Sequence, residues 1–248
     1  MFTVPDSSIN TNYRYFDFIM AFFVAVLITS NVASSAKIVD LGITLFGFWV
    51  FPPLHLAFDG GTLLFPIAYV LGDVLTEVYG YRAARRVIWT GFIALAFTSL
   101  LFFLLRILPG EAAWESYAGT DAFNAILGGM STGGIAVASL SGYLVGSFSN
   151  SMILSRLKVV MKGRALWVRV IGSSLVGELL DSLAFVSVAC LTGVFGWELF
   201  VTLVVTNYLF KVSIEVILFF FTYLAVQKLK KAEAIDTYDV GVKFGIFF

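Results

Sequence analysis

The sequence predicts an all-α integral membrane protein with six transmembrane helices and with both termini in the cytoplasm. Of its 248 residues, 59% are hydrophobic and 13% are charged, whereas soluble domains carry about 25% charged residues. Six stretches are long and apolar enough to cross the hydrocarbon core as helices, which takes about 20 residues each. Lysine and arginine gather in alternate connections between these stretches.

The predicted spans make up one integral membrane domain, residues 1–248. Each span is expected to be a helix, because a helix satisfies its own backbone hydrogen bonds where lipid cannot. A seventh apolar piece, residues 41–58, is interrupted by glycines and by Pro52 and Pro53, so we predict an interfacial or re-entrant loop there. The six spans are residues 15–36, 60–79, 86–107, 123–150, 167–193 and 198–227.

Basic residues predict the orientation, because short cytoplasmic loops of membrane proteins carry an excess of lysine and arginine. The connections on the other side hold only Lys37 and Arg106. Both termini are therefore predicted on the cytoplasmic side of the cell inner membrane. The residues that favour this orientation are Arg82, Arg85, Arg86, Arg156, Lys158, Lys162, Arg164, Arg169, Lys228, Lys230, Lys231 and Lys243.

The first span could instead be a cleaved signal peptide, because "VASSA" (32–36) offers small residues after an apolar core. The leader holds Asp6, Arg14 and Asp17 rather than a cationic segment. Loss of this helix would also spoil the even number of spans. We therefore predict that it is retained as a transmembrane helix.

Several classes of protein are disfavoured by composition and motifs. The net charge is zero, with no basic or acidic block, so no nucleic-acid partner is expected. Cys190 is the only cysteine and His55 the only histidine, so neither a disulfide nor a metal site is predicted. No nucleotide-binding P-loop or G-x-S-x-G motif occurs. We predict no cofactor and no enzymatic activity, with an intramembrane enzyme acting through paired acids as the alternative.

Ionisable side chains inside the predicted spans are the candidate functional residues. Each costs about 2.5 to 3.5 kcal/mol at the bilayer centre on insertion scales, so such residues usually serve a function. They occur as pairs three or four residues apart, which places each pair on one helix face. Three polar faces can satisfy one another only around a common cavity. The pairs are Asp73 and Glu77, Glu178 and Asp181, and Lys211 and Glu215, with Asn207 one turn before Lys211.

The simpler alternative is that these groups pair off between helices, with Lys211 bound to Glu215 or Asp181. Glu77 lies near the predicted cytoplasmic end and could reach Arg82 or Arg85 instead of a cavity. Five acids face one lysine in these spans. Some acids must then be protonated, solvated, or free for a ligand that is cationic or donates hydrogen bonds.

Aromatic and glycine residues add two further expectations. Phe65, Tyr69, Phe185 and Tyr208 fall near the polar faces, where a ring could stack on a flat ligand, although lipid or core packing is the alternative. In the fourth span, glycines form two small-xxx-small pairs, which predict close helix contacts, with a homodimer face as the alternative. These pairs are Gly129 with Gly133 and Gly142 with Gly146.

Three sequence blocks resemble the queuosine precursor transporter family, once grouped among vitamin uptake transporters. They are "LFPIAYVLGDVLTEVYGYRAARRVIW" (64–89), "LWVRVIGSSLVGELLDSLAFVSVA" (166–189) and "NYLFKVSIEVIL" (207–218). The resemblance implies a six-helix fold similar to the substrate-binding subunits of energy-coupling-factor vitamin transporters. It also implies uptake of 7-cyano-7-deazaguanine, 7-aminomethyl-7-deazaguanine or queuine for tRNA modification.

Within this resemblance, Asp73, Asp181 and Lys211 match the family best, whereas Glu178 stands where many relatives have an amide. A deazaguanine presents an N–H and an amino group on one edge, which Asp181 or Glu178 could accept. The other expected roles are a bond from Lys211 to the ring carbonyl, a bond from Asn207 to either edge, capture of a cationic aminomethyl group by Asp73 or Glu215, and stacking by Phe185 or Tyr208.

The mode of energy coupling stays open in the sequence. Protons, facilitated entry followed by metabolic trapping, and an ATPase partner are each compatible with it. The alternative functions are uptake or binding of another vitamin-like solute and a structural or partner-anchoring role in the lipid bilayer. An importer is favoured because anchoring alone would not explain the free-energy cost of placing three polar faces inside the membrane.

Overall fold

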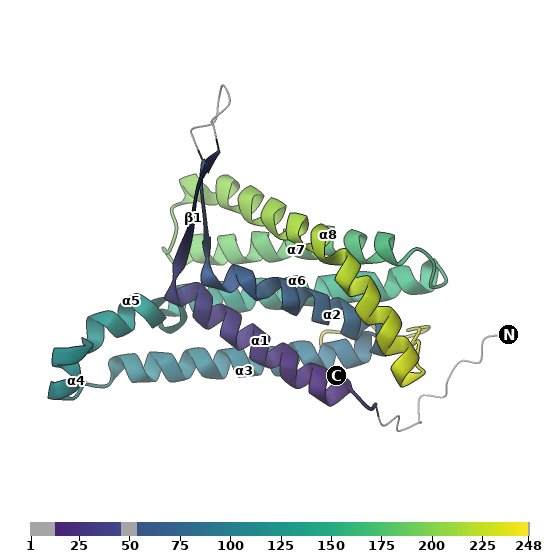
Figure 1. The fold of residues 1–248 in the computed structure, drawn as a ribbon, viewed down its shortest axis with the longest axis horizontal. Helices are drawn as coiled ribbons and strands as arrows, with labels where there is room; N and C mark the ends of the chain where they lie inside the picture. Colours follow the sequence, from purple (N-terminus) through teal and green to yellow (C-terminus); the bar gives the residue numbers. More distant parts are fainter. Residues whose placement is uncertain (1–12, 46–53, 248) are drawn as a thin grey trace.

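The structure is a computed structural model, and it describes residues 13–45 and 54–247. The described chain is a bundle of six main helices that run beside one another, with two short helices at one end (Figure 1). The main helices are α1 (Phe16–Ala36), α2 (Phe65–Tyr79), α3 (Tyr81–Ile107), α6 (Gly133–Val160), α7 (Leu166–Leu191) and α8 (Phe200–Glu233). The short helices are α4 (Ala112–Tyr117) and α5 (Gly119–Ser131).

Five helical segments of the described chain are long and apolar enough to cross a membrane. They confirm an α-helical membrane protein. The predicted second span differs from the others, because α2 has 15 residues and a spanning helix needs about 20. The five segments are Phe16–Ala36, Tyr81–Ile107, Gly119–Val160, Leu166–Leu191 and Trp197–Glu233.

The short length of α2 follows from the residues at its two ends. The 3-10 helix η1 (Gly60–Leu63) precedes it and packs against α1; a Cβ on Gly60 would lie 2.7 Å from the carbonyl oxygen of Ala33. Pro66 then occupies the first turn of α2, a position that lacks an intrahelical N–H partner anyway. Gly80, with φ of +83°, ends the helix in a conformation that other residues rarely adopt.

The predicted fourth span, residues 123–150, corresponds to parts of two helices. Thr132 is extended, with φ of −84° and ψ of 119°, and separates α5 from α6. Gly133 and Gly134 follow directly, and glycine is a poor helix former. Helix α6 then continues beyond the predicted boundary to Val160.

The segment 41–58 was predicted to be a loop, and this is wrong for its described ends. Strand β1 (Ile38–Leu45) pairs antiparallel with β2 (Leu54–Asp59), and Ile38 lies opposite Asp59. The two strands project away from the helices in Figure 1. The register shifts at Gly42, whose φ of +64° marks a bulge. The remainder of the predicted loop, 46–53, lies outside the described residues.

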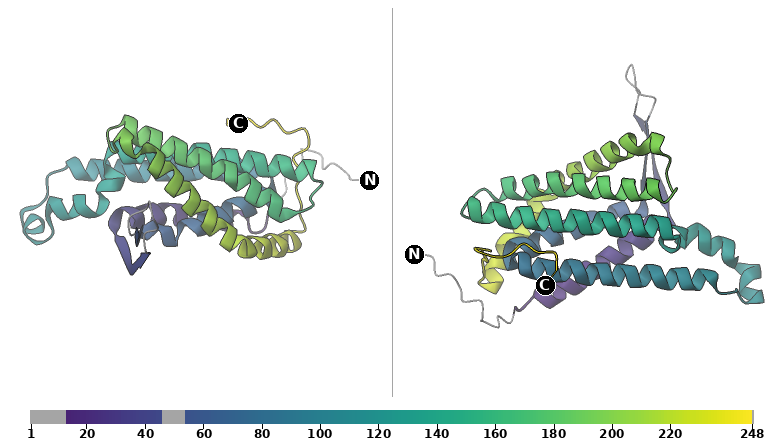
Figure 2. Two further views of the ribbon diagram at one scale, coloured as in Figure 1. Left: turned by 90° about the horizontal axis from the view of Figure 1, so that it is seen from above. Right: turned by 180° about the vertical axis from the view of Figure 1, so that it is seen from behind.

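Helices α6 and α7 lie side by side along most of their lengths (Figures 1 and 2). Glycines allow this close approach: a Cβ on Gly146 would lie 2.5 Å from Cβ of Asp181, and one on Gly177 would lie 2.8 Å from Cβ of Asn150. Gly142 likewise faces Asp181. The expected close contact at Gly142 and Gly146 is therefore a contact within the chain. Gly129 faces Ser35 of α1 instead.

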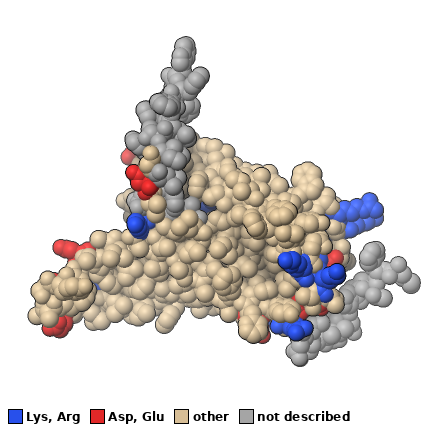
Figure 3. Space-filling view, in the orientation of Figure 1, with Lys and Arg blue, Asp and Glu red and all other residues tan. Residues whose placement is uncertain are grey.

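Lysine and arginine gather at one end of the bundle, and a broad belt without charge separates this end from the other (Figure 3). We call it the basic end. It contains the turn between α2 and α3, the turn between α6 and α7, and the end of α8. Its exposed basic residues are Arg82, Arg86, Arg156, Lys162, Arg164, Lys228 and Lys231.

The C-terminal tail, residues 234–247, folds back over the basic end and joins the α2–α3 turn to α6. Asp239, which is 8% exposed, accepts hydrogen bonds from the backbone N–H of Tyr81 (2.8 Å) and from the hydroxyl of Ser155 (2.6 Å). It thereby caps the first turn of α3, where backbone N–H groups lack helical partners. Trp89 donates to the carbonyl of Ile246 farther along the tail.

Candidate binding site

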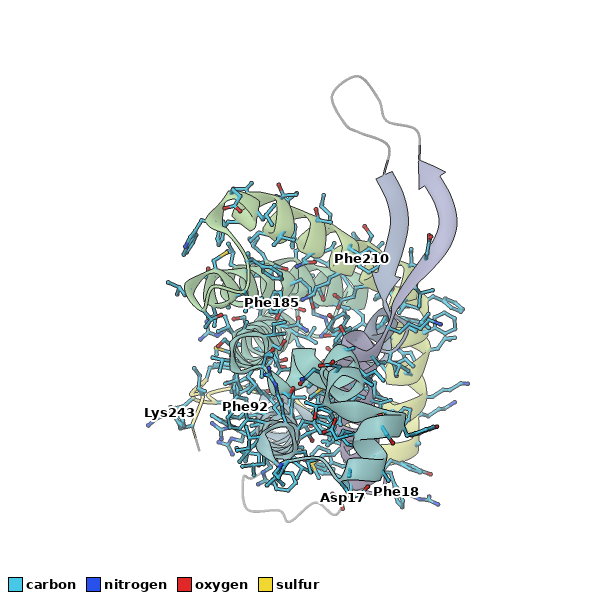
Figure 4. All side chains as sticks on the ribbon, turned by 90° about the vertical axis from the view of Figure 1, so that its left-hand side faces the viewer. Asp17, Phe18, Phe92, Phe185, Phe210 and Lys243 are labelled. Carbon is cyan, nitrogen blue, oxygen red and sulfur yellow. The ribbon has the colours of Figure 1, made fainter. Side chains whose placement is uncertain are left out.

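A cavity of about 290 Å³ lies inside the bundle, and all six main helices contribute to its wall. Five of the residues predicted from sequence line it. They come from α7 and α8, two helices that pack against each other. Figure 4 looks along the bundle and shows Phe185 on α7 and Phe210 on α8. The five predicted residues are Glu178, Asp181, Phe185, Asn207 and Lys211.

The charged part of the wall is a cluster of two acids and one lysine. Lys211 Nζ contacts Asp181 Oδ2 and lies 3.4 Å from Glu178 Oε2. The three side chains retain between 12% and 25% exposure, so they face a space that is open enough for water or a ligand. Lys211 therefore pairs with Asp181, as one alternative expected, and not with Glu215. The cluster keeps a net negative charge when all three groups are ionised.

The packing of α6 against α7 fixes the position of Asp181. Gly142 and Gly146 present no side chains at the contact, and the Asp181 side chain occupies the space that their Cβ atoms would fill. A helix of larger residues would push α7 away and move the carboxylate. The glycine pair is thus part of the construction of the cavity wall.

Unpartnered acceptors mark the polar side of the cavity. Asn150 Oδ1 and Glu178 Oε2 are buried without a hydrogen bond among the described residues, although Lys211 Nζ lies 3.4 Å from Glu178 Oε2 as an ion pair. Buried polar atoms nearly always have partners, so each unpartnered atom needs an explanation. Donors on a bound ligand would satisfy both atoms.

Two predicted residues, Asp73 and Glu215, lie beside the cavity without lining it. Asp73 is fully buried, and its Oδ1 accepts a hydrogen bond of 2.8 Å from Asn150 Nδ2. Glu215 is 4% exposed and accepts a hydrogen bond from the hydroxyl of Ser174. The predicted stacking residue Tyr208 is not among the lining residues either.

Sequence reasoning missed several lining residues because they are neutral. Asn31 brings α1 into the wall, and Asn150 connects the cavity to Asp73. The aromatic residues Phe65 and Tyr69, expected near the polar faces, line the cavity as well. Asn150 ends a predicted span that also contains many serines, so nothing in the pattern singles it out. Phe210 lines the cavity where Tyr208 was expected. Phe210 lies three residues after Asn207 and four before Ile214, so helical spacing places all three on one face of α8.

Glu77 is separate from the cavity and belongs to an ion cluster at the basic end. This buried carboxylate lies 2.9 Å from Arg169 NH1, 3.5 Å from Lys158 Nζ and 2.7 Å from Lys230 Nζ. The expected partners Arg82 and Arg85 are wrong: the cations come from α6, α7 and α8. Asp236 of the tail lies 2.5 Å from Lys158 and 2.7 Å from Lys230. The cluster ties α2, the three later helices and the tail together.

Comparison with known proteins shows the family of this chain. A family model described as a vitamin uptake transporter matches residues 59–225, which is more than half of the 248 residues. The chain belongs to this family. The match runs from the end of β2 into α8, so it contains most of the cavity wall. It excludes all of α1.

Three curated relatives support the same assignment. A probable queuosine precursor transporter of Bacillus subtilis is 27% identical over 70% of this chain and 73% of its own length. One from Haemophilus influenzae is 26% identical over 64% of each chain. The queuosine precursor transporter of Escherichia coli is 25% identical over 76% of this chain and 77% of its own length. No solved structure matches the chain.

Membership in a transporter family agrees with the apolar helices and the internal cavity. The protein is a multi-pass membrane protein, in agreement with the predicted inner-membrane location. Its family is one of transporters, which supports the prediction that it is not an enzyme.

Proposed function

We propose that the protein imports a queuosine precursor of the 7-deazaguanine type across the cell inner membrane. The observation that carries this proposal is the cavity wall in which Glu178 and Asp181 lie beside Lys211. The named function of three relatives that cover most of the chain supports it. The imported base would then serve tRNA modification.

The recognition chemistry follows from the hydrogen-bonding edges of the ligand. A deazaguanine offers a ring N–H and an amino group side by side, and a carboxylate can accept both. Asp181 or Glu178 supplies that carboxylate, and Lys211 donates to the ring carbonyl next to it. Asn150 Oδ1, which lacks a donor among the described residues, or Asn207 accepts from a remaining N–H group.

The size and apolar side of the cavity suit a flat bicyclic base. A volume of about 290 Å³ lies at the small end of the range of about 300 to 1,000 Å³ for ligand pockets, which favours a free base over a nucleotide. Phe185 and Phe210 offer ring faces on adjacent helices. Stacking of a base on an aromatic ring contributes about 1 to 3 kcal/mol.

The proposed orientation places the basic end in the cytoplasm. Its exposed lysines and arginines then lie on the side that such residues favour, and the described C-terminal tail lies there too. All six main helices cross or enter the membrane in this arrangement, with the short α2 held inside the bundle. The likeness to energy-coupling-factor binding subunits and the homodimer belong to the same proposal.

The test measures queuosine in the tRNA of bacterial cells that can neither make nor import the precursors. Cells that express the protein and receive one deazaguanine at a time should regain queuosine. Asp181→Asn should lower the uptake rate about tenfold to a hundredfold, because a hydrogen bond to a charged group is worth about 1.5 to 3 kcal/mol. Asp121→Asn, at an exposed position on α5, is the matched control and should retain uptake.

Two results would contradict the proposal. Normal uptake by Asp181→Asn, in protein inserted at the usual level, would remove the recognition model. No queuosine with any of the three compounds would favour the second candidate, uptake of another vitamin-like solute. That candidate draws on the family description alone.

A further inference from the structure

The carboxyl groups of Asp73 on α2 and Glu215 on α8 form a buried pair that lies outside the cavity wall. One oxygen of each is satisfied by a neutral donor, Asn150 for Asp73 and Ser174 for Glu215. The second oxygens, Asp73 Oδ2 and Glu215 Oε2, are buried without a donor from any other described residue. Something else must satisfy these two atoms.

The two carboxyl groups come from helices that pack against each other, and they are close enough for each to act on the ionisation of the other. An ionised carboxylate can only accept hydrogen bonds, so two carboxyl groups can bond only when one of them carries a proton. In the described part of the chain, the cation nearest in sequence, Lys211, is bound to Asp181 and Glu178 instead. A bare carboxylate pair at this burial would be very unfavourable, so a proton takes the place of a cation.

We propose that Asp73 and Glu215 form a proton-binding site that holds one proton between them and releases it to water when a cationic ligand occupies the cavity. The shared proton is argued from the pair itself. Its release on ligand binding rests on the proposed function, since it needs a ligand such as 7-aminomethyl-7-deazaguanine.

The link between the two sites is Glu178. Its negative charge acts on both members of the pair, and its side chain lines the cavity, where its Oε2 faces Lys211 at 3.4 Å without a hydrogen bond. A ligand cation next to Glu178 offsets this charge and makes the ionised pair less unfavourable. The groups that face the pair are Asn150 from α6, Ser174 and Glu178 from α7, Glu77 from α2 and, one turn earlier on α8, Lys211.

The sign of the pH effect follows from this competition. Ligand and proton each disfavour the other, so a fall in pH weakens binding of the cationic ligand. If one proton leaves for each ligand bound, affinity falls about tenfold for each pH unit. The neutral 7-cyano-7-deazaguanine lacks the cationic group and should release a smaller fraction of a proton.

The experiment counts protons by titration calorimetry of the purified full-length protein. Heats are measured at one pH in two buffers of different ionisation enthalpy, with 7-aminomethyl-7-deazaguanine as the probe. Up to one proton per ligand should be released by the wild type and none by the Asp73→Asn/Glu215→Gln double variant. The single variant Asp73→Asn keeps an oxygen for Asn150 and serves if the double variant does not fold.

A second measurement needs no ligand. The infrared spectrum of the wild type at neutral pH should contain the C=O stretching band of a protonated carboxyl group, and Glu215→Gln should lose it. Asp121→Asn, an exposed acid on α5, should leave the band unchanged.

The outcomes separate the two proposals. Ligand binding with equal proton release in wild type and double variant would overturn the link and leave the importer standing. Failure of both compounds to bind would count against the importer, and the infrared band alone would then decide whether the proton site exists. Absence of the band in the wild type would overturn the proton site whatever the ligand does.

Discussion

Two buried acids one turn apart on α2, Glu77 and Asp73, have opposite surroundings. Glu77 has three cations from three other helices within 3.5 Å. Asp73 has a single amide donor and a second acid beside it. Both are fully buried, so burial alone does not reveal the role of either. The difference teaches that a neutralised acid holds this fold together, whereas an acid without a cation is free to bind a proton.

The largest expected effect comes from removing the neutralised acid. Glu77→Gln should lower the free energy of unfolding by about 3 to 5 kcal/mol, because it leaves the buried Arg169 without its counter-charge and leaves Lys158 with Asp236 alone. Thermal unfolding of the protein in detergent measures the loss. A destabilisation below about 1 kcal/mol would show that the cluster does not anchor the bundle.

The next effect tests how the cavity wall is positioned. Gly146→Ala places a Cβ 2.5 Å from Cβ of Asp181, and overpacking of this kind costs about 1 to 3 kcal/mol. Uptake should fall together with stability, since α7 carries Asp181 away from Lys211. Gly133→Ala is the control, because its Cβ would meet no atom within 4 Å; it should retain uptake.

Asp73→Asn sharpens the comparison because it should leave stability nearly unchanged. The amide oxygen keeps the bond from Asn150, and replacement of a buried acid by a neutral group is often neutral or stabilising. We expect a change in unfolding free energy within about 1 kcal/mol, measured in the same thermal assay. A loss as large as that of Glu77→Gln would place Asp73 among the anchors.

The smallest effect concerns Asp236, the tail residue of the ion cluster. Burial opposes its ionisation, but hydrogen bonds from Lys158 and Lys230 prevail and lower its pKa below the usual 3.8. Its contribution to stability is therefore full above about pH 4 and is lost as the pH falls through the lowered pKa. The residue is 43% exposed, so solvent screening limits the contribution to about 0.5 kcal/mol.

The check compares wild type and Asp236→Asn in thermal unfolding at pH 7 and at pH 3. The difference between the two proteins should be present at pH 7 and reduced at pH 3. A difference that grows on acidification would contradict the assigned sign.

The sequence predicts the helices and the polar faces because both depend on hydrophobicity over many residues. Charged side chains are costly to bury, so Asp181 and Lys211 stand out in an apolar sequence. Five of the eight residues proposed on such grounds line the cavity. Asn150 is inconspicuous because a neutral amide in a serine-rich helix carries no comparable cost. The partners of Glu77 lie 81 to 153 residues away along the chain, and such distant pairing has no local signature.

The strands and the tail were missed for a related reason. Strand β2 is a six-residue segment next to glycines and prolines. Leu54, Leu56 and Phe58 alternate with more polar residues there, but the segment is short and the adjacent prolines favour a loop. Residues 234–247 contain no helical period. Their structure comes from bonds to Tyr81, Ser155 and Trp89, so it exists only once the helices have assembled.

The capping of α3 by Asp239 has a consequence for biosynthesis. Helices α2 and α3 leave the ribosome long before residue 239 is made, so their connecting turn must wait for that residue to gain its cap. Gly80 leaves room for the tail to pack against this turn, because a Cβ there would lie 2.8 Å from Thr237 and 3.0 Å from Asp239. Closure of the basic end thus follows formation of these helices, and a bulky insertion in the tail would interfere with maturation more than with insertion of the helices.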